Sequence, residues 1–254
     1  MDIIQAIIFG IVEGITEFLP ISSTGHMILT AKLMGLEQSA FQKSFEVIIQ
    51  LGSILAVVFV FKDKIFKDIN LWKKLIIAFL PTAVLGFTLY KIIKSLFLPQ
   101  TVAYMLIIGG VIFLIVEYFY KEKEYHIEDI KDISYKQAFL IGLFQSLAMI
   151  PGTSRSGATI IGGLLIGLKR KIAAEFTFLL AVPTMLAATG YDILKNYHEF
   201  DGSNIFLLIV GFITAFIVAL FVIKWFLGFI KKHTFVPFGI YRIFIGVVFL
   251  LYIY

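Results

Sequence analysis

The feature that most constrains this chain is a series of apolar runs, each long enough to cross a membrane. About 20 apolar residues span the hydrocarbon core of a bilayer. Six stretches approach or reach that length, at residues 45–61, 75–92, 102–120, 173–192, 205–223 and 237–254. Hydrophobic residues make up 59% of the chain, whereas soluble domains contain about 45–50%. The sequence therefore predicts a multi-pass membrane protein of the all-α class with six transmembrane helices.

Two further apolar regions are interrupted near their middles. Residues 3–19 and 21–36 are joined at Pro20, and residues 137–150 and 154–168 are joined around Pro151 and Gly152. Helices of about 14–17 residues are only about 21–26 Å long at 1.5 Å per residue, which is short of a full crossing. Non-helical backbone at membrane depth is tolerated where it lines a cavity or is buried in protein. We therefore predict two re-entrant helical hairpins, each returning to the side from which it enters.

The distribution of basic residues predicts the orientation. With this topology, the side holding both termini carries 5 Lys and Arg residues in its loops, and the other side carries 15. Cytoplasmic loops are enriched in Lys and Arg. We therefore expect both termini to face away from the cytoplasm.

The chain also repeats itself weakly. Gly10-Ile11-Val12-Glu13 followed by the run that starts at Pro20 aligns with Gly142-Leu143-Phe144-Gln145 followed by the run that starts at Pro151. Each half holds one hairpin and three spans, so the second half would be inserted upside down relative to the first. We expect one membrane domain, 1–254, built from an inverted repeat of residues 1–120 and 135–254. Inverted repeats with broken helices are typical of transporters.

The first hairpin carries an unusual set of polar residues, in the run EGITEFLPISSTGH at 13–26. Ionisable residues inside a membrane segment are costly and usually functional. Glu13 and Glu17 are four apart and share a helix face. They are predicted either to hold a divalent cation, Mg²⁺ or Ca²⁺, or to supply a general acid or base. His26 is a candidate nucleophile or base, and Ser23 is a second candidate nucleophile.

The second hairpin supplies a cation in the run PGTSRSG at 151–157. The guanidinium of Arg155 can grip phosphate oxygens and stabilise charge in a transition state. Hydroxyls and free N–H groups at a helix N-terminus attract phosphate, and glycines allow a close approach of the backbone. The predicted phosphate-binding residues of the two runs are Ser22, Thr24, Gly152, Thr153, Ser154, Ser156 and Gly157.

Other polar residues are given weaker roles. Arg242 lies a few residues into the last predicted span, and we expect it to snorkel to the cytoplasmic surface. Glu46 and Gln50 form another pair four residues apart, for which cavity lining and headgroup contact are both open. Cysteine is absent, which excludes disulfides and thiolate chemistry. The net charge of +5 reflects cytoplasmic loops, so no nucleic-acid partner is expected.

The two runs, together with FEVIIQLG at 45–52, resemble the signatures of the bacterial undecaprenyl-diphosphatase family of the bacitracin-resistance type. The resemblance implies an enzyme of the bacterial inner membrane. Its substrate is a polyprenyl diphosphate lipid, from which it removes the terminal phosphate at a site open to the outer face, and it depends on a divalent cation. Membrane lipids are its other partners, and a homo-oligomer stays open.

Carried over by motif position, the catalytic set is Glu13, Glu17, Ser23, His26 and Arg155. Whether the serine, the histidine or a water attacks the phosphorus stays open. The rival interpretation is a transporter or flippase for a phosphate-bearing lipid, which the inverted repeat alone favours. The phosphatase and the transporter interpretations rest on the same physical hypothesis. Both hairpin tips meet inside the bilayer and bind one diphosphate headgroup.

Overall fold

The described part of the chain is mainly helical. The rest consists of turns, an irregular connector at residues 120–129 and one isolated β-bridge between Ile127 and Leu168. The structure is a computed structural model, and it describes residues 1–36, 39–196 and 202–253. Its α-helices are α1 (Ile3–Thr16), α2 (Ser23–Leu33), α3 (Ala40–Val60), α4 (Lys62–Lys67), α5 (Ile69–Thr88), α6 (Tyr90–Ser95), α7 (Pro99–Phe119), α8 (Tyr135–Ser146), α9 (Arg155–Leu165), α10 (Arg170–Asn196), α11 (Gly202–Phe229) and α12 (Val236–Ile253). The predicted all-α class is confirmed.

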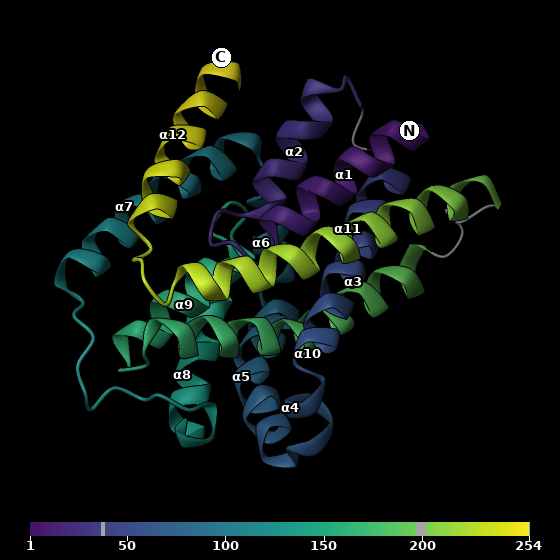
Figure 1. Cartoon of the computed structure of the whole chain (residues 1–254). Coiled ribbons are helices and arrows are strands. Elements are labelled where there is room, and N and C mark those ends of the chain that lie inside the picture. Colours follow the sequence, from purple (N-terminus) through teal and green to yellow (C-terminus); the bar gives the residue numbers. More distant parts are fainter. Residues whose placement is uncertain (37–38, 197–201, 254) are drawn as a thin grey trace.

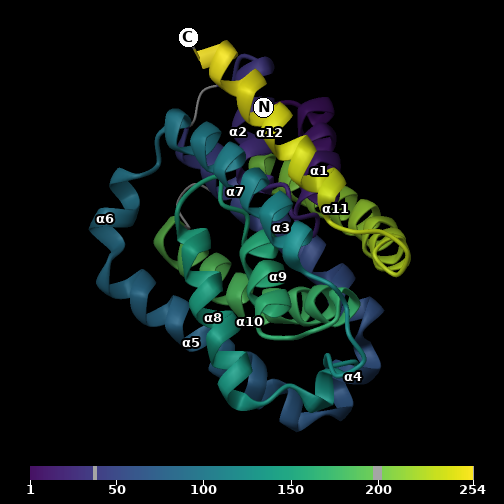
Figure 2. The same ribbon diagram turned by 90° about the vertical axis from the view of Figure 1, so that its left-hand side faces the viewer.

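Two helical hairpins approach each other from opposite ends of the molecule. Both termini and the hairpin α1–α2 lie toward one end, whereas α4 and the start of α8 lie toward the other (Figures 1 and 2). α1 packs mainly along α11, α8 packs mainly along α5, and α7 and α12 pack against each other. The two hairpin tips therefore point toward the interior, where the helices cross.

Five of the described helices are long and apolar enough to cross a membrane, namely α3, α5, α7, α10 and α11. α12 is apolar but shorter, and α1 is shorter again. The helix ends differ from the predicted ends by several residues. The second predicted span, for instance, is observed as α5, which begins six residues earlier and ends four residues earlier than predicted. The coarse prediction of a multi-pass membrane protein is supported.

The same local device starts the first helix of each hairpin. Asp2 caps α1 by accepting a hydrogen bond from the backbone N–H of Gln5, whose side chain accepts one from the Asp2 N–H in return. Ser134 and Gln137 form the same capping box at the start of α8. Such reciprocal caps satisfy backbone donors that a helix N-terminus otherwise leaves unpaired.

The second helix of each hairpin also starts in the same way. Ser22 and Ser154, which cap α2 and α9, have φ angles of 72° and 73°. A positive φ is uncommon for a residue with a side chain, and such strain persists only where surrounding structure imposes it. The Oγ atom of each serine accepts a hydrogen bond from the backbone N–H three residues on, at Gly25 and Gly157. Both tips are therefore sharply turned and end in a serine-capped helix.

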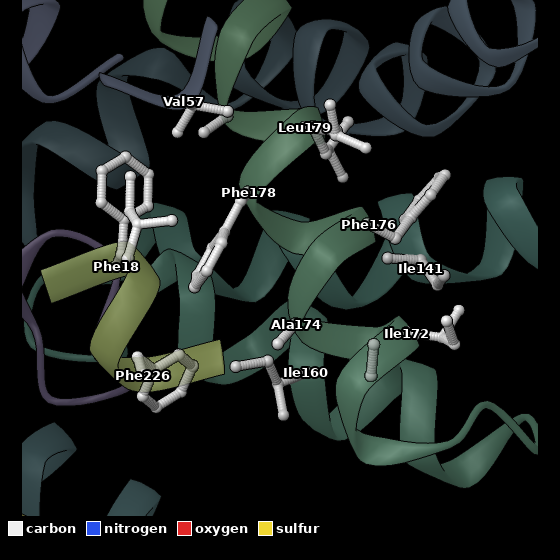
Figure 3. Packing of buried hydrophobic residues seen from close by; sticks show 14 of the residues in the cluster. Phe18, Val57, Ile141, Ile160, Ile172, Ala174, Phe176, Phe178, Leu179 and Phe226 are labelled. Atoms are coloured by element: carbon white, nitrogen blue, oxygen red, sulfur yellow. The ribbon is translucent and has the colours of Figure 1, made fainter. Parts of the chain in front are cut away.

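A buried aromatic cluster packs against the first tip. Phe18 follows Glu17 directly and is fully buried. Its ring meets the ring of Phe178 of α10 edge to face, with centroids 5.1 Å apart, and Phe226 of α11 lies beside them (Figure 3). Large aromatic side chains in such contacts contribute much of the packing energy of a core. The carboxylate of Glu17 is thus carried on a segment that close packing holds in place.

Candidate active site

Residues from both hairpin tips line one cavity with a volume of about 230 Å³. The first tip contributes Glu17, Ser22, Ser23 and Thr24, and the second contributes Pro151, Gly152, Ser154 and Arg155. The rest of the wall comes from α3, α5, α8 and α10 and from the segments that follow α6 and α8. Its residues are Gln50, Thr82, Phe97, Gln145, Ala148, Met149, Thr184 and Met185. Residues that are more than 120 positions apart in the sequence thus line one cavity.

Three of the predicted catalytic side chains form a continuous chain of contacts across that cavity. Ser23 Oγ donates a hydrogen bond of 2.6 Å to Glu17 Oε2. The other carboxylate oxygen, Oε1, accepts a hydrogen bond of 3.0 Å from Nη2 of Arg155. The side chains of this ion pair are 4% and 11% exposed, respectively. The predicted meeting of the two tips is observed, and it joins a hydroxyl, a carboxylate and a guanidinium.

Arg155 retains a free donor at this site. Its Nη1 donates to the carbonyl oxygen of Thr177 at 2.9 Å, and Nη2 is occupied by Glu17. Its Nε is buried and has no hydrogen-bond partner among the described residues. A buried, unpaired donor on a cation is costly unless a ligand accepts from it. The arrangement is suited to an anion that approaches the guanidinium from the cavity.

Glu13 lies one helical turn behind Glu17 and is completely buried. Neither of its carboxylate oxygens has a hydrogen-bond partner among the described residues. Within that part of the chain, no group of three or more His, Asp and Glu side chains is placed to hold a metal ion. Mg²⁺ is often held by only one or two carboxylates together with substrate phosphates. Glu17 lines the cavity whereas Glu13 does not, and a cation held by the pair together with a bound phosphate stays a prediction.

His26 lies outside this chain of contacts. Its Nδ1 is 2.8 Å from the Ser22 carbonyl oxygen, and its Nε2 is 2.8 Å from the hydroxyl of Tyr241 on α12. A carbonyl oxygen only accepts, so Nδ1 carries a proton, and Nε2 of the neutral ring accepts from the tyrosine. The imidazole ring also stacks on the Tyr241 ring, with centroids 5.6 Å apart. His26 is not among the residues that line the cavity, and its catalytic role stays a prediction.

The predicted phosphate-binding residues divide into two groups. Ser22, Thr24, Gly152 and Ser154 line the cavity. The other three lie behind it within the described structure: Thr153 has a buried Oγ1 without a partner, Ser156 Oγ donates to the Leu19 carbonyl at 2.9 Å, and the Gly157 N–H donates to Ser154 Oγ at 3.1 Å. These three shape the tip rather than its cavity surface.

A second cluster of polar side chains, to which the sequence pattern gives little weight, also lines the cavity. Gln145 Nε2 donates to Thr82 Oγ1 at 3.0 Å, and Thr184 Oγ1 donates to Gln145 Oε1 at 3.2 Å. These three residues and Gln50 line the cavity. The available signal was the alignment of Gln145 with Glu13 in the internal repeat. Thr82 and Thr184 sit singly in apolar spans, and neither carries a pattern of its own.

Glu46 does not line the cavity. It accepts a hydrogen bond of 2.9 Å from Nε2 of Gln42 on the same helix. Glu175, its counterpart in the repeat, pairs with Lys64 Nζ at 2.6 Å near the opposite end of the molecule. Both glutamates lie in the N-terminal part of their helices, α3 and α10, and their side chains are held by neighbouring polar residues.

The prediction that Arg242 snorkels to the cytoplasmic surface is wrong. The residue is fully buried, and its guanidinium donates to backbone carbonyls of α7 and of both hairpin tips. The close crossing of α7 and α12 explains the difference. Gly110 of α7 faces Gly239 of α12 so tightly that a methyl group added to Gly110 would lie 2.6 Å from the Gly239 carbonyl oxygen. That crossing carries the start of α12 into the protein interior.

Comparison with known protein families matches residues 6–248 to the family described as bacitracin resistance protein BacA. This chain belongs to the BacA family. Curated relatives named undecaprenyl-diphosphatase match it along its length. The protein from Persephonella marina is 64% identical over 253 residues, covering 100% of both chains. That from Sulfurihydrogenibium sp. is 60% identical over 252 residues, covering 99% of this chain and 100% of that protein. That from Wolinella succinogenes is 58% identical over 253 residues, covering 100% and 99%.

Membership confirms the family resemblance inferred from the two runs and the stretch 45–52. In this BacA family member, the two runs form the two tips, and they contribute most of the polar side chains around the cavity.

Proposed function

We propose that this protein is a membrane-embedded phosphatase that hydrolyses undecaprenyl diphosphate to undecaprenyl phosphate and inorganic phosphate, and so recycles the lipid carrier of cell-wall glycans. The observation that carries the proposal is the chain of contacts from Ser23 through Glu17 to Arg155 at the cavity. It combines a nucleophile, a base and a phosphate-binding cation. The printed names of the relatives support the choice of substrate.

The size of the cavity favours a substrate whose tail stays in the membrane. Pockets that enclose a drug-sized ligand have volumes of about 300–1,000 Å³, and this cavity has about 230 Å³. It suits a diphosphate headgroup and not a polyprenyl chain. Keeping the chain in lipid avoids re-exposing CH₂ groups, each of which is worth about 0.8 kcal/mol. The apolar side chains at the wall, Phe97, Met149 and Met185, offer the first units of the chain a path to the bilayer.

In the proposed reaction, Ser23 Oγ attacks the terminal phosphorus while its proton passes to Glu17. The bond between that phosphorus and the bridging oxygen breaks, and undecaprenyl phosphate leaves with the bonding electron pair. Water then attacks the phosphoserine, releases inorganic phosphate and restores the hydroxyl. Arg155 stabilises the charge that develops on the phosphoryl oxygens, as preorganised cations do in phosphoryl transfer.

We propose that Glu13 and Glu17 hold a divalent cation together with the diphosphate. When bound, such a cation would neutralise phosphate charge and polarise the phosphoryl oxygens. The two buried, unpartnered oxygens of Glu13 support this assignment. The carboxylates of this chain would orient the headgroup so that its terminal phosphorus faces Ser23.

The proposal includes an inverted repeat of six spans and two re-entrant hairpins. The caps Asp2 and Ser134, and likewise the strained serines Ser22 and Ser154, are 132 residues apart. The pairing of α1 with α11 corresponds to that of α8 with α5. This architecture equally favours the rival function, a carrier that moves a polyprenyl phosphate lipid across the membrane.

We propose that the termini and the mouth of the cavity face away from the cytoplasm. The basic residues Lys62, Lys64 and Lys67 of α4 lie at the end opposite to the termini, and Lys64 pairs with Glu175 of α10 there. A reporter enzyme that works only outside the cytoplasm, fused after residue 254, should be active. Activity of a cytoplasm-specific reporter at that junction would reverse the assignment.

The function is tested with purified protein in detergent and in vesicles. We expect release of inorganic phosphate from undecaprenyl diphosphate, with loss of that release in a Glu17→Ala variant that remains folded. Movement of labelled undecaprenyl phosphate across vesicles, without phosphate release from the diphosphate, would support the carrier instead.

Chelation tests the cation assignment. We expect excess EDTA to abolish phosphate release and added Mg²⁺ or Ca²⁺ to restore it, because two carboxylates and a diphosphate repel one another without a cation. Glu13→Gln should raise the cation concentration needed for half-maximal rate. Unchanged turnover in EDTA would remove the metal role of both glutamates.

A further inference from the structure

Arg242 is a buried cation that sequence reasoning did not place at the site. Its side chain donates four hydrogen bonds, all to backbone carbonyls. The acceptors are Leu106 at 3.3 Å and Met105 at 3.0 Å on α7, Pro20 at 3.1 Å in the first tip, and Gly152 at 3.0 Å in the second tip. One guanidinium thus joins three separate parts of the chain.

The two tip carbonyls are close in sequence to the reacting side chains. Pro20 is three residues before Ser23, and Gly152 is three residues before Arg155. Because Arg242 holds both carbonyls, it fixes the distance between the segments that carry the hydroxyl and the guanidinium. Two other direct links join the tips among the described residues. Arg155 Nη2 donates to Glu17 Oε1 at 3.0 Å, and Ser156 Oγ donates to the Leu19 carbonyl at 2.9 Å.

Ordinary ion pairing does not account for this residue. The ion pairs within the described residues do not include Arg242. Burying a charge is costly unless hydrogen bonds compensate for it, and here only carbonyl dipoles do so. Space for the guanidinium comes from Gly109, where an added methyl group would lie 2.7 Å from its Cζ atom. The absence of a side chain at Gly109 leaves the space that the Arg242 guanidinium occupies.

We propose that Arg242 is a positioning residue that holds the two hairpin tips in register, so that Ser23 and Arg155 meet the same phosphoryl group. The proposal rests on the proposed phosphatase function. Its adjacent residue Tyr241 binds His26, so the start of α12 fixes the first tip at two points. Misplacement of a reacting group by about 1 Å costs about 10²-fold in rate.

The first test compares two lysine substitutions. Lysine keeps the charge but lacks the planar fork that reaches several acceptors at once. We expect Arg242→Lys to lower kcat for phosphate release by about 10- to 100-fold, with KM changed less than kcat because the lipid tail supplies much of the binding. Arg170→Lys, which replaces a guanidinium bound to Glu117 away from the cavity, should leave kcat near the wild-type value.

The second test displaces the guanidinium without changing it. Gly109→Ala places a methyl group against the Arg242 side chain and improves helix propensity. We expect it to lower kcat as Arg242→Lys does. Its control is Gly228→Ala in α11, where an added methyl group meets nothing within 4 Å. Wild-type kcat in both Arg242→Lys and Gly109→Ala would overturn the proposal.

A third measurement does not depend on activity. Because the chain contains no cysteine, spin labels can be attached at Thr24→Cys on the first tip and at Ala148→Cys in the segment that leads into the second tip. We expect Arg242→Lys and Gly109→Ala to broaden and lengthen the distance distribution between the labels, and the two controls to leave it unchanged. An unchanged distribution in the folded variants contradicts the proposal. If wild-type protein releases no phosphate, only the proposed function fails, and the distances still decide the role of Arg242.

Discussion

Arg155→Lys should lower kcat for phosphate release by about 10²–10³-fold, the loss seen when a preorganised group that stabilises transition-state charge is removed. The guanidinium uses Nη1 for the Thr177 carbonyl and Nη2 for Glu17, and its buried Nε has no hydrogen-bond partner among the described residues. A lysine carries all its donors on one nitrogen, so it cannot hold several acceptors in the fixed planar geometry of a guanidinium. The charge is retained, so any loss reports on that geometry.

Lysine is a better probe here than alanine. The Glu17 side chain is only 4% exposed, and removing the partner of a buried charge typically costs about 3–5 kcal/mol of stability. Arg155→Ala therefore risks a folding defect that would obscure its kinetic effect. Thermal unfolding in detergent should be measured for Arg155→Lys alongside kcat, with Arg170→Lys as the matched control. A folded Arg155→Lys protein with kcat within threefold of wild type would exclude Arg155 from charge stabilisation.

The sequence was sufficient to predict the meeting of the two tips. Ionisable residues in short, proline-broken apolar segments are costly unless they face one another, which predicts that Glu17 and Arg155 lie close together. The same reasoning misjudged Arg242. Its place near the start of a span suggested snorkelling, whereas the glycines Gly109 and Gly110 of α7 admit it to the interior. Reading those glycines requires knowing which helix crosses α7.

The hydrogen-bond partners of His26 also could not be predicted from the sequence. Because it lies three residues after Ser23 in the same helix, the sequence makes it a candidate nucleophile or general base. Its ring instead bonds to Tyr241, a residue 215 positions away. Contacts over such separations are set by helix packing and leave no local pattern.

The second large expected effect is the loss of kcat on replacing Ser23, which should far exceed the loss on replacing His26. Ser23→Ala should lower kcat by about 10³-fold or more, the order of loss expected when a nucleophile is removed. His26→Ala should cost about tenfold, because it removes hydrogen bonds worth about 0.5–1.5 kcal/mol each from the support of the first tip. Tyr241→Phe, which deletes only the partner hydroxyl, should reproduce part of the His26→Ala effect. Ser53→Ala removes a buried hydroxyl of α3 outside the cavity and should leave kcat unchanged.

Rapid quenching of the reaction distinguishes the possible nucleophiles. If Ser23 attacks phosphorus, mass spectrometry of the quenched protein should find phosphate on the peptide that contains Ser23, and none in Ser23→Ala. Phosphate on His26, together with a larger loss in His26→Ala than in Ser23→Ala, would assign the attack to the imidazole. Equal losses with no phosphorylated peptide would indicate direct attack by water, because Glu17 would then activate a water molecule instead of the serine hydroxyl it now accepts from.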